Sequence, residues 1–546
     1  MTRVLRFAGT HLFVNAIGSL SLELLSAESD AVLATSYPWS GDSTRAELSF
    51  DAPLNRTLQP FASRGVDGST RYTARIRVLL RPSAKIFALW AAANSCGASE
   101  GFVSMGGPGM DGPTDSAGSC GQLDGLVAKE KGPLQRRVFN VRHYGAIGDN
   151  TSYDTVAVRA AAKALLQAGG GTLLFPAGGA YLTAPFNVSS HSIVAIEAGA
   201  TVTGSPRAED FPLVDPIEMY GWGSMPHPLI YATGATNVTL TGGGKIDGLD
   251  QPWYPGYPGN WAGKAGDCLT DPPCAGPHMI LFRNSTDITV SNITAIRSRN
   301  FPLHFALVDN LHVHNVTSHI GYGDSIIVTS VQNGLIENCD FRSNKNAINV
   351  GSGIGAFARR YGRPTRNVTF RQIHVTGQDH GGGTLSIGSI IGAGVYDITF
   401  EHIALNGTSR GLRIETRAGM GGVVDGIVYR NITGVNMGAC PSWQTPRKGQ
   451  AWTDIDIDLL GGLGKKSKCN TTVSNVLYED ITITGGPGAG QIFGSGACTI
   501  SNVTMKNVRL GGGKAAKASF GACHVQGGVC VGEVDPCPPC FARPDL

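Results

Sequence analysis

Three polar clusters in the 546-residue chain contain side chains that could exchange protons with a substrate or bind one. They follow one another between residues 310 and 417, and each is set among short apolar runs. Their ionisable members are Asp324, Lys345, Asp379, His380, Arg413 and Glu415, and Asn346 adds an amide. Such groups perform general acid–base catalysis. Because equivalent positions of a solenoid stack on one face, the clusters predict a groove for a long polymer.

The elements that must position these clusters are short strands, each preceded by a polar anchor residue. Apolar residues recur at the first, third and sixth positions after the anchor. Asn, Asp and Gly tolerate the left-handed backbone conformation, so a ladder of them suits a tight corner in every coil. The pattern predicts an all-β fold, a right-handed parallel β-helix formed as a single-stranded solenoid. The anchors are Asn237, Asp287, Asn310, Asn333, Asn367, Asp397, Gly426, Asn475 and Asn502.

The spacing of the anchors is irregular. Most successive anchors lie 23 to 34 residues apart, but the intervals Asn237 to Asp287 and Gly426 to Asn475 are close to 50. Each long interval fits either two coils or one coil with a long loop.

Three regions differ in composition. Residues 1–97 alternate like antiparallel strands and predict a small β-sandwich-like module. Residues 98–136 are rich in Gly, Ser and Pro and predict a linker. Residues 137–546 hold the repeat and a Cys-rich tail, and Asp154 is a candidate N-cap for one amphipathic helix covering the start of the solenoid.

Bulk composition excludes some partners. Charged residues make up 16% and the net charge is +3, so no charged block favours nucleic acid. No run of 18 apolar residues predicts a membrane span. Twelve Cys, several close in sequence near residues 268–274 and 523–540, favour disulfides over zinc and a secreted, extracellular or cell-wall protein. Connectivity stays open. Asn-X-Ser/Thr sequons allow a glycoprotein, and we expect a monomer without metal or cofactor.

Several segments of the chain resemble glycoside hydrolase family 28, the polygalacturonases, with the plant-type and exo-acting branches most similar. They include FNVRHYGAIGDNTSYDT from residue 139, GGGTLLFPAGGAYLTAPFNV from 169, YGRPTRNV from 361 and GLRIETRAGMGGVVDGI from 411. The resemblance extends over nearly all of residues 138–540. It implies the parallel β-helix and hydrolysis of glycosidic bonds in pectin or a related acidic cell-wall polysaccharide.

The resemblance also assigns places to the polar residues. Asp324 matches the last residue of the family's Asn-Thr-Asp motif, and Arg413 matches the Arg of Arg-Ile-Lys. Lys345 and Asn346 stand where the family has its Asp-Asp pair, and Glu415 stands where it has Lys. In strict register, Gly383 stands where the family's Gly-His-Gly motif has its His, and His380 lies three residues earlier.

These replacements lead to two expectations. An inverting hydrolase needs an acid and a base about 6.5 to 9.5 Å apart, so Asp324 would pair with Asp379 or Glu415, with His380 nearby. Lys345, Asn346, Arg413 and Glu415 would bind substrate in one groove, with Lys345 and Glu415 forming an ion pair. The alternative for Glu415 is a structural ion pair with Arg413, Arg417 or Lys345. The alternatives are a catalytically inactive glycan-binding protein and, more weakly, a polysaccharide lyase with Lys345 or Arg413 as base.

Overall fold

A computed structural model describes two compact units, residues 1–131 and 132–546. The described residues are 5–8, 11–26, 29, 31–36, 39–48, 50, 62–64, 70–80, 85–92, 137–214, 225–249, 276–321, 323–343, 345–355, 358–359, 362–377, 383–408, 410–416, 421–437, 454–459, 471–485, 490–494, 498–511 and 520–544.

The first unit is a seven-stranded antiparallel sheet built around one long strand, β2. Strand β2 pairs with β3 and β4, and also with β6 and β7, while β1 and β5 pair with β6. The predicted linker, residues 98–136, lies outside the described residues, so the proposed domain boundaries stay a prediction. The strands are β1 (Leu5–Ala8), β2 (His11–Leu25), β3 (Val32–Thr35), β4 (Trp39–Leu48), β5 (Ala62–Arg64), β6 (Thr70–Leu80) and β7 (Lys85–Ala92).

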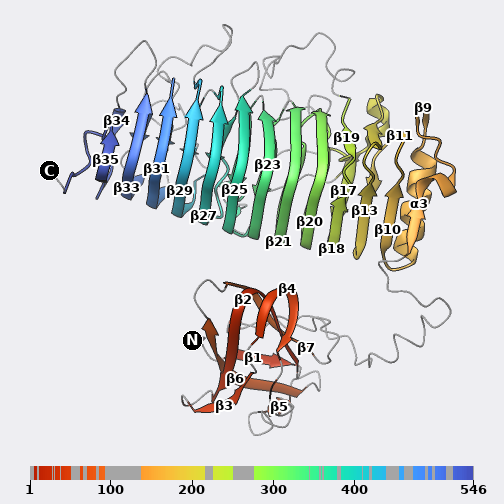
Figure 1. Ribbon diagram of the computed structural model, residues 1–546, viewed down its shortest axis with the longest axis horizontal. Coiled ribbons are helices and arrows are strands. Elements are labelled where there is room, and N and C mark those ends of the chain that lie inside the picture. The colour runs from red at the N-terminus through yellow and green to blue at the C-terminus, as the bar shows by residue number, and fades with distance from the viewer. Residues whose placement is uncertain are drawn as a thin grey trace. The chain divides into compact units, whose positions relative to one another are not determined.

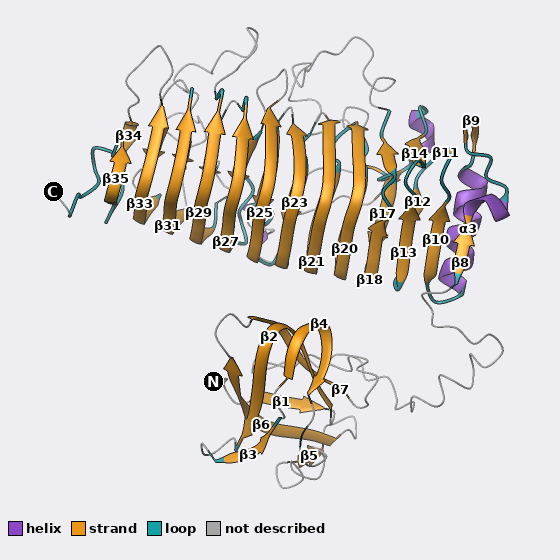
Figure 2. Cartoon of the chain, viewed as in Figure 1, coloured by secondary structure: helices purple, strands orange, loops and turns teal. Residues whose placement is uncertain are grey.

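Near the start of the second unit lies the predicted amphipathic helix, α3 (Thr155–Gln167), which packs on the first strands of the solenoid (Figure 2). Its buried face carries Val158 and Leu165. Asp154 occupies the N-cap position, but its side chain makes no cap hydrogen bond. The carboxylate instead accepts hydrogen bonds from the backbone N–H groups of Ile147 and Gly148, so it ties the preceding loop to the helix start.

The rest of this unit is the predicted parallel β-helix, in which each coil stacks on the one before (Figure 1). We name its longest face the long-strand sheet. Its members pair in parallel from one coil to the next: β8 (Val138–Asn140), β10 (Gly171–Phe175), β13 (Ser192–Ile196), β18 (Thr236–Thr241), β20 (Ile280–Ser298), β21 (Leu303–Gly321), β23 (Gln332–Ser343), β25 (Thr365–Gly377), β27 (Val395–Asn406), β29 (Val423–Val435), β31 (Thr472–Thr484), β33 (Thr499–Gly511) and β35 (Val529–Asp535).

The polar clusters lie on a second face, which we name the site sheet. The starts of β20 and β21 belong to it, because they continue the pairing from β17 to β22. Its other strands are β12 (Phe186–Asn187), β17 (Ile230–Thr233), β22 (Ile326–Thr329), β24 (Asn346–Gly351), β26 (Thr384–Ile387), β28 (Leu412–Glu415), β30 (Ile455–Asp458), β32 (Gly490–Phe493) and β34 (Phe520–Cys523).

The early coils have a third face made of separate strands, and it continues in the last parts of β20, β21 and β23. Its separate strands are β9 (Asp149–Tyr153), β11 (Ala180–Thr183), β14 (Thr201–Gly204) and β19 (Lys245–Asp247). Short elements beside it are η3 (Val141–Tyr144), η4 (Ala208–Asp210) and the antiparallel pair β15 (Leu213–Val214) and β16 (Met225–Pro226).

The predicted corner ladder is confirmed, because every anchor has a positive φ. The eight Asn and Asp anchors lie between 51° and 59°, and Gly426 is at 70°. Their side chains also bond from coil to coil: Asn333 donates to Asn310 at 3.4 Å, and Asn367 donates to Asn333 at 2.8 Å. The ladder therefore fixes both the bend of the chain and the register of the stack.

A second corner follows five residues after each anchor, which the sequence analysis missed. Its residues also have positive φ, and Asn315 donates to Asn292 at 3.2 Å. From Asp287 onward the corner residues are Asn292, Asn315, Asn338, Gln372, His402, Asn431, Asp480 and Asn507. The sequence carried this signal, since a polar residue stands at the fifth position after each of these anchors.

Direct strand pairing shows how many coils lie in each of the two long intervals between anchors. Strand β18 pairs with β20, and β29 pairs with β31, so each interval of about 50 residues is one coil with a long insertion. The third position after the anchor forms a stack of buried rings inside the solenoid. Phe400 lies 5.0 Å from Phe370 and 4.8 Å from Tyr429 between ring centroids.

The Cys-rich tail contains disulfides, as predicted, and not a zinc site. Cys523 bonds to Cys540, and Cys530 bonds to Cys537, so both Cys of the CPPC sequence are oxidised. Within the described part of the chain, no helix is long and apolar enough to span a membrane.

We predict that Asn367→Ala is less stable than Asn367→Gly by about 1–2 kcal/mol, because Ala strains the left-handed corner whereas Gly adopts it freely. Both variants lose the same side-chain hydrogen bonds, so their difference isolates the backbone. Chemical denaturation of the two variants measures it. Equal denaturation midpoints would show that the corner does not impose this conformation.

Candidate active site

Along each strand of the site sheet, side chains alternate between the hydrophobic core and the outer face of the solenoid. Ile387, Ile414 and Ile457 are buried in the hydrophobic core, so the residues beside them in sequence point out of the solenoid. Strand register aligns those outward residues in one row along the solenoid axis: Asn349, Ser386, Arg413, Asp456 and Gln491. The sheet therefore presents a polar row with one side chain per coil.

Asp324, just before β22, is fixed by the next coil. It is 1% exposed, and its Oδ1 accepts hydrogen bonds from the backbone N–H and Nδ2 of Asn346, both at 3.1 Å. Its Oδ2 accepts a 2.7 Å bond from Nδ2 of Asn349. Lys345 Nζ lies 3.8 Å from Oδ1 and 5.8 Å from the centre of the Phe301 ring. This carboxylate is held by three donors and a cation.

Arg413 on β28 is the centre of a second group. Its Nη2 pairs with Glu415 Oε2, and its Nε lies 3.3 Å from Asp456 Oδ2 on β30. All three side chains are nearly buried. Gly388 allows this packing, because a Cβ at its φ of 110° would overlap the backbone oxygen of Glu415. The guanidinium is therefore neutralised from two sides by protein carboxylates.

The five described site residues thus lie on one sheet but in two groups. Two coil spacings, or roughly 10 Å, separate Lys345 on the β24 coil from Glu415 on β28. The predicted Lys345–Glu415 ion pair is wrong, because Lys345 lies beside Asp324 and Glu415 pairs with Arg413. Asp324 and Glu415 are three coils apart, roughly 14 Å, too far for the acid–base pair considered from the sequence.

The other two predicted catalytic residues, Asp379 and His380, lie outside the described residues. Their assignment stays a prediction.

Sequence reasoning missed three acidic residues on β30 or just before it: Asp454, Asp456 and Asp458. They alternate with Ile455 and Ile457, which are fully buried in the core. The alternation Asp-Ile-Asp-Ile-Asp is a strand signal, and its acids on one face were visible in the sequence. All three acids are nevertheless buried, at 1%, 3% and 5% exposure.

Burial changes the acidity of two of these carboxyls. It raises the pKa of Asp454 from 3.8 to about 7. Burial also raises the pKa of Asp456 to about 6. Arg413, Arg410 and a hydrogen bond from Gln491 oppose the rise, and Asp458 adds to it. Both groups therefore titrate within about one unit of neutrality, as catalytic acids and bases often do.

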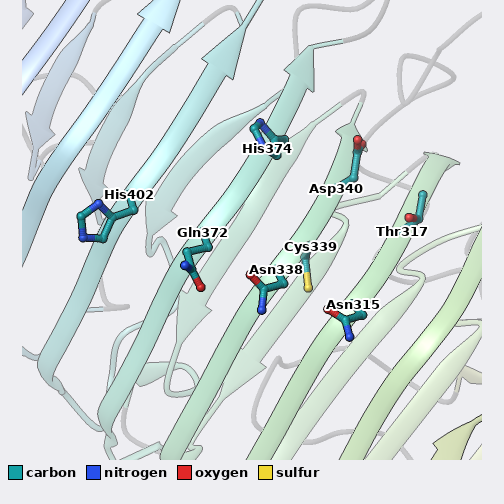
Figure 3. Close-up of a pocket in the computed structure, with 8 residues that line it drawn as sticks. All are labelled: Asn315, Thr317, Asn338, Cys339, Asp340, Gln372, His374 and His402. Atoms are coloured by element: carbon teal, nitrogen blue, oxygen red, sulfur yellow. The ribbon is translucent and has the colours of Figure 1, made fainter.

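A separate hollow of about 620 Å³ lies on the long-strand sheet (Figure 3). It follows the second corner ladder, and its lining comes from neighbouring strands: Asn315, Thr317, Asn338, Cys339, Asp340, Gln372, His374 and His402. It shares no residue with the site sheet. Among the described residues no cluster of His, Cys, Asp or Glu is arranged to hold a metal ion.

The fold and the polar row define a class, the right-handed parallel β-helix proteins. An exopolygalacturonase from Thermotoga maritima matches with a TM-score of 0.61 at 22% identity, covering 76% of this chain and 96% of that structure. A family 28 exopolygalacturonase from Yersinia enterocolitica matches with a TM-score of 0.52 at 14% identity, covering 98% and 99%. At these identities the likeness shows the fold.

The family profile of glycosyl hydrolases family 28 matches residues 188–527, more than half of the sequence, and the chain belongs to that family. A "probable polygalacturonase" from Vitis vinifera is 28% identical over 332 residues, covering 58% of this chain and 65% of that protein. An exo-poly-alpha-D-galacturonosidase from Dickeya chrysanthemi is 25% identical over 338 residues, covering 54% of each. The chain therefore matches less than two thirds of the length of these two relatives.

We predict that Asp324→Asn lowers the free energy of unfolding by about 1–3 kcal/mol, because one new amide N–H₂ must face a buried donor of Asn346 or Asn349. Asp397→Asn is the matched control, since Asp397 is an exposed corner anchor where other coils carry Asn, and it should change stability by less than about 0.5 kcal/mol. Chemical denaturation compares them. Equal effects would show that Asp324 does not hold the coils together.

A pH-dependent stability effect follows from Asp454. The folded chain keeps its proton up to about pH 7, whereas the unfolded chain loses it near 3.8, so this stabilisation is complete below pH 3.8 and is lost as the pH rises through 7. The loss is at most about 4 kcal/mol. Asp454→Asn has no such proton, so its stability relative to wild type should rise between pH 4 and 8. Chemical denaturation between pH 4 and 8 measures both free energies of unfolding. A difference between wild type and Asp454→Asn that stays constant with pH would contradict this.

Proposed function

We propose that this protein is a glycoside hydrolase that cleaves glycosidic bonds in pectin or a related acidic cell-wall polysaccharide. The observation that carries the proposal is its membership of glycosyl hydrolases family 28 over residues 188–527. The site sheet fits a polymer, because its polar row repeats once per coil along the solenoid axis. We also propose a monomer that acts outside the cell or in the cell wall, for which the disulfides of the tail provide support.

Release of reducing ends from a panel of glycans tests this function. The panel should contain polygalacturonate, methyl-esterified pectin, branched pectin and neutral cell-wall glycans. Activity on a pectic member, absent from a boiled sample, is the expected result. Purified protein that binds a pectic glycan and releases no reducing ends from any member would overturn it.

A second candidate function is glycan binding without catalysis. Lys345 and Asn346 favour it, because they occupy the place of the family's Asp-Asp pair and neither supplies a carboxylic acid. The full engagement of Asp324 by Asn346 and Asn349 favours it too. The lyase alternative is tested in the same assay by the ultraviolet absorbance of an unsaturated product.

We predict that rebuilding the family pair with Lys345→Asp and Asn346→Asp raises activity on polygalacturonate only when Glu415→Lys is added. The first two changes return carboxylates beside Asp324. The third gives the site a cation near Arg413, which then keeps Asp456 as its acidic partner. The triple variant should release reducing ends at least about tenfold faster than the double variant, as expected for about 1.4 kcal/mol of binding to a uronate.

Equal rates for the double and triple variants would show that Glu415 does not hinder a uronate. Circular dichroism of both variants confirms that the coils remain folded.

A further inference from the structure

Hydrolysis needs a proton donor, and the described residues at the family's place do not supply one. Lys345 and Asn346 carry no carboxyl group. Both oxygens of Asp324 already accept hydrogen bonds from the next coil, one from Asn346 and one from Asn349. Asp324 therefore serves as a contact between coils, and a carboxyl whose oxygens have no protein donor is better placed to give a proton to a leaving oxygen. A carboxyl on another coil of the site sheet would meet this need.

Carboxyl oxygens on β30 and just before it have no hydrogen-bond partner among the residues that the structure describes. Neither Oδ1 nor Oδ2 of Asp454 accepts a hydrogen bond from any residue that the structure describes, and the same holds for Oδ1 of Asp456. Ser386 lies in the same outward row, two coils before Asp456, and its buried Oγ also makes no hydrogen bond within the described part of the chain. Buried polar atoms of this kind normally have a partner, so these four atoms, on three residues of the site sheet region, are suited to bind a polar ligand.

The spacing of the two carboxyls suits one reaction. Asp454, in the bend just before β30, and Asp456, on β30, stand on either side of Ile455, which is extended and buried in the core. At about 3.3 Å per residue, the Cα atoms of Asp454 and Asp456 are roughly 6.6 Å apart. Inverting glycosidases place acid and base about 6.5 to 9.5 Å apart, whereas retaining enzymes need about 5 to 5.5 Å.

We propose that Asp454 and Asp456 are the acid and the base of a hydrolytic centre displaced along the site sheet from the family's usual place. This inference rests on the proposed function and assigns its catalytic residues. The carboxylic acid of Asp454 gives its proton to the glycosidic oxygen as the bond from that oxygen to the anomeric carbon breaks. A water molecule attacks the anomeric carbon from the opposite face and gives a proton to Asp456. Exchange with solvent then restores both groups, and the sum is one glycosidic bond plus water giving two sugar ends.

The surroundings fit these two roles. Burial alone raises the pKa of Asp454, which keeps it protonated near neutral pH as a general acid requires. Asp456 faces Arg413 on β28 at 3.3 Å, and the charges of Arg410 and Asp458 also act on it. The guanidinium favours its ionised form, as a general base requires. Oδ2 of Asp456 pairs with Arg413, and the Gln491 side chain on β32 also acts on this carboxyl. Oδ1 makes no hydrogen bond within the described part of the chain and is the oxygen that we assign to the attacking water.

The test uses Asp454→Asn and Asp456→Asn in the full chain, with Asp397→Asn as the matched exposed control. Each site variant should lower kcat by about 10²- to 10⁴-fold on whichever glycan of the panel the wild type cleaves. Glycan affinity in calorimetry should change less than threefold, about RT ln 3, because the amide keeps the shape of the carboxyl. The control should keep wild-type kcat.

Two further readouts separate catalysis from a structural role. The wild-type pH profile of kcat/KM should be bell-shaped with limbs near pH 6 and 7, from the base and the acid. In the residual activity of Asp454→Asn the alkaline limb should be lost, and in Asp456→Asn the acidic limb. Proton NMR of the first product should show the inverted anomer.

The outcomes divide cleanly between the two proposals. A wild type that cleaves pectin while Asp454→Asn stays within threefold of its kcat overturns the displaced centre and leaves the proposed function standing. Retention of the anomeric configuration does the same. A wild type that binds but cleaves no glycan of the panel overturns both, because no acid or base is then needed.

Discussion

The register between coils is the constraint on which the rest of the structure depends. It is set where the chain turns, by anchors such as Asn333 and Asn367 that hold a left-handed backbone and bond to the anchor of the coil before. With the corners fixed, every coil presents the same positions to the same face. Phe370, Phe400 and Tyr429 therefore stack inside, and Ser386, Arg413 and Asp456 align outside. The repeated corner therefore determines both the packing of the core and the alignment of the outer polar row.

Alignment of this kind makes a site residue depend on the coils beside it. Asp324 is held by Asn346 and Asn349 from the next coil, and Arg413 is shared between Glu415 on its own strand and Asp456 on the next. Replacing a residue in one coil thus changes the charge balance of its neighbours. Glu415 stands at the position where the family's motif has Lys, and it forms an ion pair with Arg413, two residues before it. Substitutions on the site sheet consequently act in groups.

The sequence predicted the solenoid well because its signals are local. Anchors and buried positions lie within seven residues, and Asn367, Val368, Phe370 and Ile373 behave as the pattern requires. The site was predicted less well because its contacts join residues from different coils across insertions of unequal length. The sequence offered Glu415 an ion pair with Arg413, Arg417 or Lys345 and could not choose among them, whereas in the structure the partner is Arg413. Asp454 was missed because an acid in a strand indicates solvent, and here that face is buried.

Burial of the carboxyl groups of Asp324 and Asp454 is unfavourable for folding unless other interactions compensate for it. A carboxyl without a hydrogen-bond partner costs stability in a protein interior, and its ionised form costs more. Asp454 has no such partner among the described residues, so a small apolar residue in its place would stabilise the coil. Asp324, by contrast, is equally buried but receives three hydrogen bonds that offset its desolvation. Of the two carboxyls, Asp324 is explained as a structural contact. Asp454 has no hydrogen bond among the described residues that would offset its burial, and this supports the catalytic role that we propose for it.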